Sequence, residues 1–384
     1  MKYFVSQLIR LVPRKRNRIV YGGSLDLFID NAKHLFILNN EQMPDVHHIW
    51  LSNNKNTLHQ VQALGFCAVR SKSLKGLYLM LTARMIIFDN MINDFSYHTL
   101  SSGAIRLELW HGVPYCKHIG ISRTDNPVPF QRKLAQRFNY MDEHLHGDIC
   151  ISPSEKARVI FSASFCIPIE SIILSDYPRC RFLYMTSEEI NNFVKQYEPI
   201  STQRLFSSIN SETRKKVLYM PTFRDADPNY ISKAIPNWAE FNEFLESNDI
   251  LIYLKVHRMT PIPHMSYSNI IILDNALDVY PIMPLFDMLI TDYSSIMYEF
   301  ALLHKPIVLY TFDMDLYIKY SRNIYSSFIN QLKELSNVSD YKSLEYILSS
   351  PGKSIKPFPT DTYFDFANHI ENLILFIKDN TSVS

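Results

Sequence analysis

Short apolar, β-branched runs alternate with longer amphipathic stretches along most of this chain. Such runs are typical of strands buried in a parallel sheet, and the stretches between them have the spacing of helices. In the first half, strands are predicted at residues 18–21, 47–51, 67–70, 85–88, 105–110 and 148–151. In the second half, they are predicted at residues 216–220, 250–256, 270–273, 288–291 and 306–310. The alternation predicts an α/β protein with two doubly wound domains.

Helical spacing predicts helices at residues 276–286 and 294–304, and an amphipathic closing helix at residues 360–378. The segment Ser152-Pro153-Ser154-Glu155 has the composition of a capping box with proline in the first helical position. We therefore interpret Ser154 as part of a helix cap and not as a catalytic residue.

Domain boundaries follow from composition. The polar stretch 201–216 has weak periodicity and is interpreted as a linker or a surface helix. It separates an N-terminal domain of residues 19–200 from a C-terminal domain of residues 217–358. Residues 359–384 are expected to form a closing helix and tail. A length of 384 residues fits two domains of ordinary size.

Composition narrows the class of function. A formal net charge of +1 creates no field that would attract nucleic acid, so no nucleic-acid partner is expected. The five cysteines are scattered without a CxxC pair, which indicates a reducing, cytoplasmic compartment. The chain has nine glycines and neither a G-x-G-x-x-G nor a Walker A pattern, which disfavours a dehydrogenase or a P-loop kinase.

Residues 1–18 have an amphipathic character. They combine apolar positions with a basic cluster, namely Tyr3, Phe4, Val5, Leu8, Ile9 and Val12 followed by Arg14, Lys15, Arg16 and Arg18. No apolar run approaches the roughly 18 residues that span a bilayer, and no signal-peptide pattern is present. Two interpretations stay open, a helix docked on the first domain with solvated charges and an interfacial helix at an anionic membrane surface.

Ligands bind beyond the carboxyl ends of parallel strands, and two predicted strand exits carry a histidine. His111 leaves an apolar strand directly into a Gly/Pro turn that begins at Gly112. Glycine permits close approach and proline stiffens the loop, so His111 is a candidate general base; a structural histidine is the alternative. Lys255 and His257 share one face of a later strand because side chains alternate. This pair suits an anionic ligand, and a solvated strand end is the alternative.

A third strand exit, at residues 290–295, leads into a predicted helix. Ser294 and Ser295 would lie at the helix N-terminus, where free N–H groups and the helix dipole favour phosphate. Glu299 follows one turn later and is a candidate for binding a ribose hydroxyl pair. The alternative is simple capping by Ser294 or Asp292, and Asp292 is otherwise a supporting residue.

The fourth strand exit, at residues 220–225, contains Arg224, whose side chain ends in a guanidinium group. Arg224 can bind a phosphate through two N–H donors, Asp225 can orient it, and Thr222 supports the loop. An Arg–Asp pair at the surface is the alternative. Four polar exits aimed at one cleft together favour a nucleotide-binding active site.

Metal binding has little support. Asp225-Ala226-Asp227 and Asp313-Met314-Asp315 match the D-x-D pattern, which is common by chance. His47-His48 and His144-Leu145-His146 are interpreted as surface histidines and not as metal ligands. No metal and no cofactor are expected.

Several of these segments resemble the CDP-glycerol glycerophosphotransferases, the polymerases and primases of teichoic acid and capsule synthesis. The similar segments are LWHGVPYCKHIG at 109–120, YMPTFRD at 219–225, LKVHR at 254–258, ITDYSSIMYEF at 290–300, IVYGGSLDLFIDNAKHLF at 19–36 and DYPRC at 176–180. The resemblance implies a GT-B architecture of two facing Rossmann-like domains. It further implies metal-independent transfer of a polyol phosphate from CDP-glycerol or CDP-ribitol to a polymer or lipid-linked hydroxyl, with release of CMP.

The resemblance also implies roles for the candidate residues. His111 would deprotonate the acceptor, and His257 would stabilise charge on the pyrophosphate. The donor would further be held by Ser294, Ser295, Arg224, Lys255 and Glu299. Family members work at the inner face of the membrane, which favours the interfacial helix. Tyr115-Cys116-Lys117 departs from the more basic stretch of the family, which leaves the acceptor open.

Two other functions compete with this one. The first is a GT-B glycosyltransferase that uses a nucleotide sugar in surface-polysaccharide synthesis. The second is a non-catalytic scaffold that binds a polyanion or a membrane through its basic N-terminus. The scaffold gives no reason for the WHG and TDYSS segments to occur together.

Overall fold

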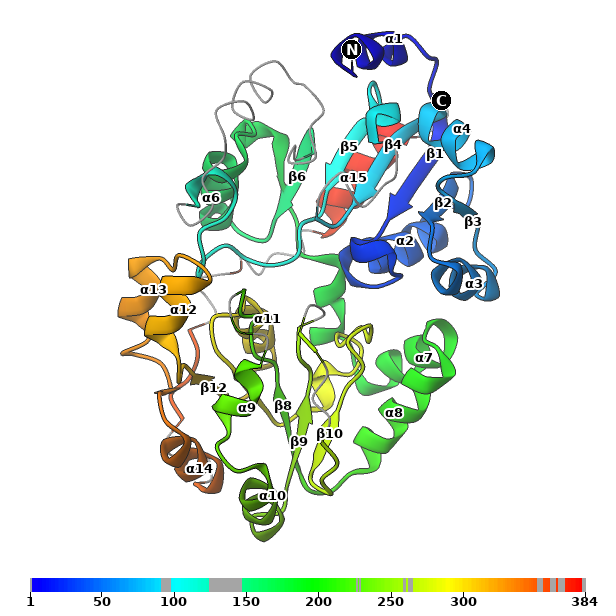
Figure 1. Cartoon of the computed structure of the whole chain (residues 1–384). Coiled ribbons are helices and arrows are strands. Elements are labelled where there is room, and N and C mark those ends of the chain that lie inside the picture. The colour runs from blue at the N-terminus through cyan, green and yellow to red at the C-terminus, as the bar shows by residue number, and fades with distance from the viewer. Residues whose placement is uncertain are drawn as a thin grey trace.

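The computed structural model describes residues 2–90, 98–123, 147–225, 227, 229–257, 260–261, 265–350, 355–359, 364 and 370–381. It consists of two α/β domains that face each other, with the first domain uppermost in Figure 1. Each domain is built on a sheet whose strands are all parallel, of seven strands in the first and six in the second.

The first sheet has the order β3-β2-β1-β4-β5-β6-β7. Its strands are β1 (Lys15–Gly22), β2 (His47–Ser52), β3 (Ala68–Arg70), β4 (Ala83–Phe88), β5 (Ile105–Glu108), β6 (Ile149–Ser152) and β7 (Ile172–Leu174). In the centre, Val20 pairs with Ile49 on one side and with Ile86 on the other. Central strands of a sheet covered on both faces must be apolar throughout, which explains the short β-branched runs of the sequence.

The second sheet has the order β10-β9-β8-β11-β12-β13. Its strands are β8 (Lys215–Tyr219), β9 (Ile250–Leu254), β10 (Ile270–Ile272), β11 (Met288–Thr291), β12 (Ile307–Tyr310) and β13 (Asn337–Val338). In both sheets the strand order reverses beside the first strand, at β1/β4 and at β8/β11. Such a switch point opens a crevice at the carboxyl ends of the strands.

Helices cover both sheets. In the first domain they are α1 (Lys2–Arg10), α2 (Asp30–Gln42), α3 (Lys55–Ala63), α4 (Leu74–Thr82), α6 (Glu155–Phe165) and α7 (Ser187–Tyr197). In the second they are α9 (Tyr230–Ala234), α10 (Trp238–Ser247), α11 (Ile296–Phe300), α12 (Met314–Tyr320), α13 (Ser326–Gln331) and α14 (Tyr341–Ser349). Ser154 caps α6 by accepting from the Ala157 N–H, which confirms its capping role.

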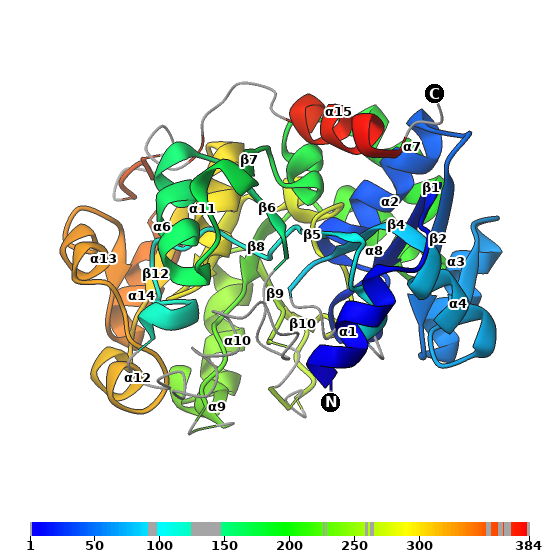
Figure 2. The same ribbon diagram turned by 90° about the horizontal axis from the view of Figure 1, so that it is seen from above.

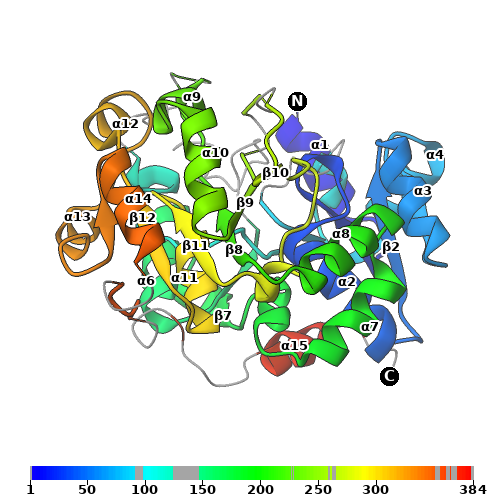
Figure 3. The ribbon, with the colours of Figure 1, turned by 90° about the horizontal axis from the view of Figure 1, so that it is seen from below.

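The chain crosses between the domains twice. Helices α7 and α8 (Ile200–Ser211) make the first crossing along one side of the molecule (Figure 3). Helix α15 (Ile370–Thr381) returns to the first domain and packs on β1, β4 and β7. Seen from above, α15 and α1 lie on opposite sides of the first sheet (Figure 2). The closing helix is therefore part of the first domain, although it follows the second in sequence.

The predicted strands are present, one predicted helix is wrong, and two further short strands were not predicted. Strands β7 and β13 were not predicted because runs of three and two residues fall below the length that a pattern can reveal. The predicted helix at 276–286 is wrong: only a 3-10 turn at Met283–Leu285 forms, because Pro281 and Pro284 remove N–H donors. Of the two interpretations of the polar stretch 201–216, the structure confirms the helix: most of it is α8, and its last residues begin β8. Of the closing segment, residues 360–363 and 365–369 lie outside the described residues.

Candidate active site

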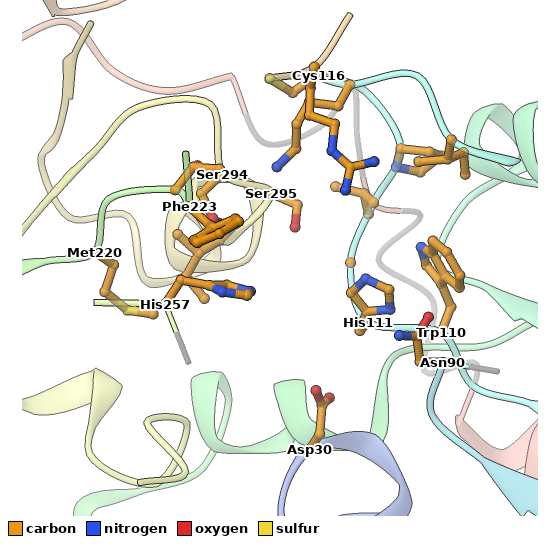
Figure 4. A pocket seen from close by; sticks show the side chains of 18 of the residues that line it. Asp30, Asn90, Trp110, His111, Cys116, Met220, Phe223, His257, Ser294 and Ser295 are labelled. Carbon is orange, nitrogen blue, oxygen red and sulfur yellow. Dashed lines mark hydrogen bonds between the residues drawn. The ribbon is translucent and has the colours of Figure 1, made fainter. Parts of the chain in front are cut away.

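A cleft of about 680 Å³ lies between the carboxyl ends of the two sheets. Its walls contain eight of the eleven residues singled out from the sequence, namely His111, Gly112, Thr222, Asp225, Lys255, His257, Ser294 and Ser295. They come from the exits of β5, β8, β9 and β11. Figure 4 shows His111 and His257 directed toward one another across the open space, with Ser295 pointing into it from a third side.

A strained turn after β5 presents His111. Trp110 has a φ of 58° and Gly112 a φ of 147°, so the backbone reverses sharply around His111. The turn is held from behind, because Asn31 Nδ2 donates to the Trp110 carbonyl at 2.9 Å and the Tyr177 hydroxyl donates to the Gly112 carbonyl at 3.0 Å. The imidazole of His111 is exposed at the cleft. Strain of this kind is characteristic of functional sites.

At Gly112 the first domain approaches the second closely inside the cleft. A Cβ atom at this position would lie 2.3 Å from Ser295 Oγ and 3.0 Å from Ser295 Cβ. Only glycine therefore lets the turn of the first domain reach the serine loop of the second. Behind this contact, the rings of Tyr115 and Tyr298 pack edge to face at 5.4 Å across the same boundary.

The exit of β9 presents His257. Its side chain is exposed, and its ring lies 5.5 Å from the Phe223 ring. Lys255 lines the cleft but is buried, and its ammonium donates to the carbonyls of Asp274 and Asn275, both at 3.2 Å. These two bonds hold the loop after β10 beside the cleft.

Arg224 lies behind the cleft wall. The residue is 2% exposed, and its guanidinium donates to Asp292 Oδ2 at 2.8 Å and to Asp313 Oδ2 at 2.7 Å. Burial lowers the pKa of Arg224, but the two carboxylates outweigh burial and raise it. Because Arg224 does not line the cleft in the described structure, the expected direct clamp on a phosphate would require it to leave this cluster. Its observed contacts hold the exits of β8, β11 and β12 together.

Asp292 is a positioning residue in the same cluster. Its carboxylate accepts from the backbone N–H groups of Thr222 at 2.9 Å and Tyr293 at 2.6 Å. It is 1% exposed. These bonds tie the loop after β8 to the serine loop after β11. Support of a bound donor by Asp292 and Thr222 stays a prediction.

Glu299 is also placed differently from the expectation. It is fully buried and accepts from Arg179 Nε at 3.0 Å, Arg179 Nη2 at 2.6 Å and the Tyr280 hydroxyl at 2.6 Å. Arg179 lines the cleft and also donates to Asp30 Oδ1 at 2.6 Å. Glu299 is therefore a partner of Arg179, and a contact with ribose would compete with these bonds. Sequence reasoning assigned no role to Arg179, although it lies in the DYPRC segment.

Two further interdomain contacts flank the cleft. At one end, backbone bonds join the segment after the glycine turn to residues 323–325: the Tyr325 N–H donates to Cys116 at 3.0 Å and the His118 N–H to Asn323 at 3.1 Å. At the other end, Asp278 accepts from His34 Nε2 at 2.8 Å. Both contacts are made by backbone or buried groups, so they fix the width of the cleft.

Among the described residues, no group of three or more His, Cys, Asp and Glu side chains could hold a metal ion. Asp313 of the second D-x-D pattern is occupied by Arg224. His48 is buried, not at the surface as expected, with Nδ1 3.0 Å from the Tyr21 hydroxyl and Nε2 3.0 Å from the Met43 carbonyl. His144 and His146 lie outside the described residues.

Two facing Rossmann-like domains with a polar interdomain cleft define a protein of the GT-B class. The chain belongs to the CDP-Glycerol:Poly(glycerophosphate) glycerophosphotransferase family, whose model matches residues 4–334. Membership confirms both the family resemblance and the class of enzyme.

Curated relatives agree with the family. A teichoic acid poly(ribitol-phosphate) polymerase of Bacillus spizizenii is 25% identical over 342 residues, which cover 85% of this chain and 50% of that protein. A teichoic acid glycerol-phosphate primase of Bacillus subtilis is 24% identical over 345 residues, which cover 88% of this chain and 81% of that protein. A solved structure of the wall teichoic acid polymerase TagF superposes with a TM-score of 0.71 at 20% identity, covering 99% of this chain and 94% of that one. It confirms the fold.

Proposed function

We propose that this protein transfers a polyol phosphate, most simply glycerol phosphate, from a CDP-activated donor to a hydroxyl of a surface polymer or lipid-linked primer. The observation that carries the proposal is the opposition of His111 and His257 across one cleft whose walls come from both domains (Figure 4). One histidine lies on each domain, so each can serve one of two substrates. The family and the names of its polymerase and primase relatives support the same chemistry.

The reaction forms a bond between the acceptor oxygen and the β-phosphorus and breaks the bond from that phosphorus to the CMP oxygen. Phosphoryl transfer depends mainly on positioning and charge stabilisation. We assign His111 to the acceptor proton, because its turn belongs to the first domain. We assign His257 and the hydroxyls of Ser294 and Ser295 to the donor phosphates, with Lys255 supplying positive charge beside them.

The test is a set of parallel incubations, each with one donor, CDP-glycerol, CDP-ribitol or a nucleotide sugar, with CMP release and product length measured. Release of CMP with growth of the acceptor supports the proposal and identifies the polyol. Transfer from the nucleotide sugar alone would overturn it in favour of a glycosyltransferase. Retained polymer binding by a protein without turnover would instead indicate a scaffold.

We further infer that α1 docks the enzyme on the anionic inner face of a membrane. Val5 and Leu8 of this helix are 41% and 52% exposed, and Leu11, directly after it, is 79% exposed, whereas Ile9 is buried. Arg10 and Lys15 are exposed beside them. An apolar helix face bordered by cations binds interfaces that carry anionic lipid. Among the described residues, no helix is long and apolar enough to cross a bilayer.

Sedimentation with vesicles tests this inference. Wild-type protein should bind vesicles with anionic lipid and bind neutral vesicles weakly. A Leu8→Ser, Leu11→Ser variant should lose binding by about 10-fold or more, since each leucine contributes roughly 1.5–3 kcal/mol when fully buried. Equal binding of both proteins would exclude α1 as the contact. Tyr3 and Phe4, which belong to the apolar positions of this segment, have side chains that are not among those the structure describes.

A further inference from the structure

Asp30 is a carboxylate in the cleft that sequence reasoning left without a role. It begins α2, lines the cleft, and its side chain is 13% exposed. Figure 4 shows the carboxylate pointing into the space between His111 and His257. Its backbone has a φ of 68°, a conformation that side-chain-bearing residues rarely adopt. The chain thus maintains an unusual conformation where a carboxylate meets the reaction space.

Only one of the two carboxylate oxygens is occupied within the described residues. Oδ1 accepts from Arg179 Nη1 at 2.6 Å and from the Asn31 N–H at 2.7 Å. Oδ2 accepts no hydrogen bond from the described part of the chain. The carboxylate is therefore held rigidly by one oxygen and offers the other to a ligand.

The position of Asp30 relative to His111 is set by its neighbour. Asn31 is fully buried, and its Nδ2 donates to the carbonyl of Trp110, the residue before His111, at 2.9 Å. Its Oδ1 accepts from the Arg179 N–H at 3.2 Å. The start of α2, the histidine turn and Arg179 consequently form one rigid unit of the first domain. This unit places Asp30 on the same side of the cleft as His111.

We propose that Asp30 Oδ2 accepts a hydrogen bond from a hydroxyl of the acceptor polyol, adjacent to the hydroxyl that attacks. A carboxylate accepts hydrogen bonds and donates none, and it repels phosphate. The group that it binds is therefore the neutral polyol end of a phosphate-rich substrate. Bound there, the polyol presents its attacking hydroxyl to His111 while its own phosphodiester is kept away. This inference rests on the proposed function and assigns the residue that selects the polyol end.

The experiment compares two synthetic acceptors with CDP-glycerol as donor. One is an oligo(glycerol phosphate) that ends in glycerol, and the other ends in propane-1,3-diol and lacks only the hydroxyl beside the attacking one. Loss of a hydrogen bond to a charged group lowers kcat/KM by about 10- to 100-fold. Wild-type protein should prefer the glycerol end by that factor. Asp30→Asn, which keeps Oδ1 and replaces the accepting Oδ2 by an amide, should remove the preference.

Two readouts separate this role from a structural one. Asp30→Asn should lower kcat/KM for the glycerol-ended acceptor by a much larger factor than it changes the KM for CDP-glycerol or the slow hydrolysis of the donor by water, because neither of these uses the polyol subsite. Asp45→Asn, an exposed change in the turn that follows α2, is the matched control and should behave as wild type. A KM for the donor raised together with loss of hydrolysis would assign Asp30 to the donor and overturn the proposal.

Failure of the inference and failure of the proposed function look different. If wild-type protein releases no CMP from CDP-glycerol or CDP-ribitol, the proposed function is wrong. If it releases CMP and extends both acceptors equally, the function stands and the role of Asp30 is wrong. The comparison of the two acceptors uses wild-type protein alone, so it tests whether the polyol hydroxyl is recognised even if Asp30→Asn does not fold. A preference that survives in folded Asp30→Asn also overturns the proposal.

Discussion

Arg179 of the first domain and Glu299 of the second form a two-point ion pair beside the cleft, with Nε–Oε2 at 3.0 Å and Nη2–Oε1 at 2.6 Å. Both side chains are almost completely buried, at 4% and 0% exposure. The same guanidinium holds Asp30. One cation thus joins the two domains and fixes a carboxylate of the acceptor side, so interdomain geometry and site geometry depend on the same residue.

Glu299→Gln tests the strength of this joint. The variant leaves Arg179 paired with Asp30 but without the charged partner that joins it to the second domain; breaking a buried ion pair costs up to about 3–5 kcal/mol. We expect the variant to unfold at a clearly lower urea concentration, as followed by circular dichroism. Glu155→Gln is the control, because Glu155 pairs with Arg158 on the surface and its side chain is 59% exposed; exposed pairs contribute about 0–1 kcal/mol. Equal midpoints for the two variants would contradict a structural role for Glu299.

Gly112→Ala tests the contact between the domains. The added methyl group would clash with Ser295 Oγ at 2.3 Å, in a backbone region that alanine avoids. We expect turnover to fall by about 100-fold or more, since displacements of about 1 Å have cost that much in enzymes. Gly65→Ala is the matched control: Gly65 has a φ of 82° and nothing within 4 Å of the added atom. It should lose about 1–2 kcal/mol of stability and keep full turnover per folded molecule.

The positions of the two histidines could be predicted from sequence because the cause is local. A short apolar strand ends, and the residue after it must lie at the carboxyl edge of a parallel sheet. His111 and His257 both obey this rule, and the sheet topology then brings their loops to one cleft.

The roles of the charged residues could not be predicted in the same way, because their partners are distant in sequence. Arg224 meets Asp313 across 89 positions, and Arg179 meets Glu299 across 120. A single sequence shows that a positively charged residue is present, but it does not show which carboxylate forms an ion pair with it. Asp30 was missed for the same reason, since its importance follows from the bonds of Arg179 and Asn31.

His48 makes the stability of the first domain depend on pH. Burial lowers its pKa from 6.5 to about 4. The folded state therefore holds it neutral while the unfolded chain takes up a proton below pH 6.5, so stability falls as the pH drops from 6.5 toward 4. At about 1.4 kcal/mol per pH unit, the loss reaches roughly 3 kcal/mol.

Urea unfolding of His48→Gln and His47→Gln between pH 7 and 4 measures this dependence. His47 is exposed on the same strand and provides the control. The His48 variant should lose about 3 kcal/mol less than wild type over this range, whereas the His47 variant should follow the wild-type curve. Parallel curves for all three proteins would show that His48 takes up its proton equally in both states.

The two cleft histidines should differ in what they contribute. For His111→Ala we expect kcat to fall by about 10²- to 10⁴-fold, the usual contribution of a general base, with donor affinity unchanged. For His257→Ala we expect both turnover and donor affinity to fall, because the imidazole lines the cleft together with the groups of the second domain that we assign to the donor phosphates. Calorimetric titration with CDP-glycerol and initial rates of CMP release separate the two effects.

The outcome that would reverse these roles is a loss of donor binding in His111→Ala. Both side chains are exposed and neither is part of a buried cluster, so each can be removed without the cavity penalty of a core residue. A fall in activity can then be attributed to chemistry or binding, provided that the urea midpoints match the wild-type value. Unchanged donor affinity in His257→Ala would move the pyrophosphate toward Ser294 and Ser295. Since Ser295 touches Gly112, the donor phosphate would then lie directly against the histidine turn, and His111 would be the single histidine in contact with the reacting group.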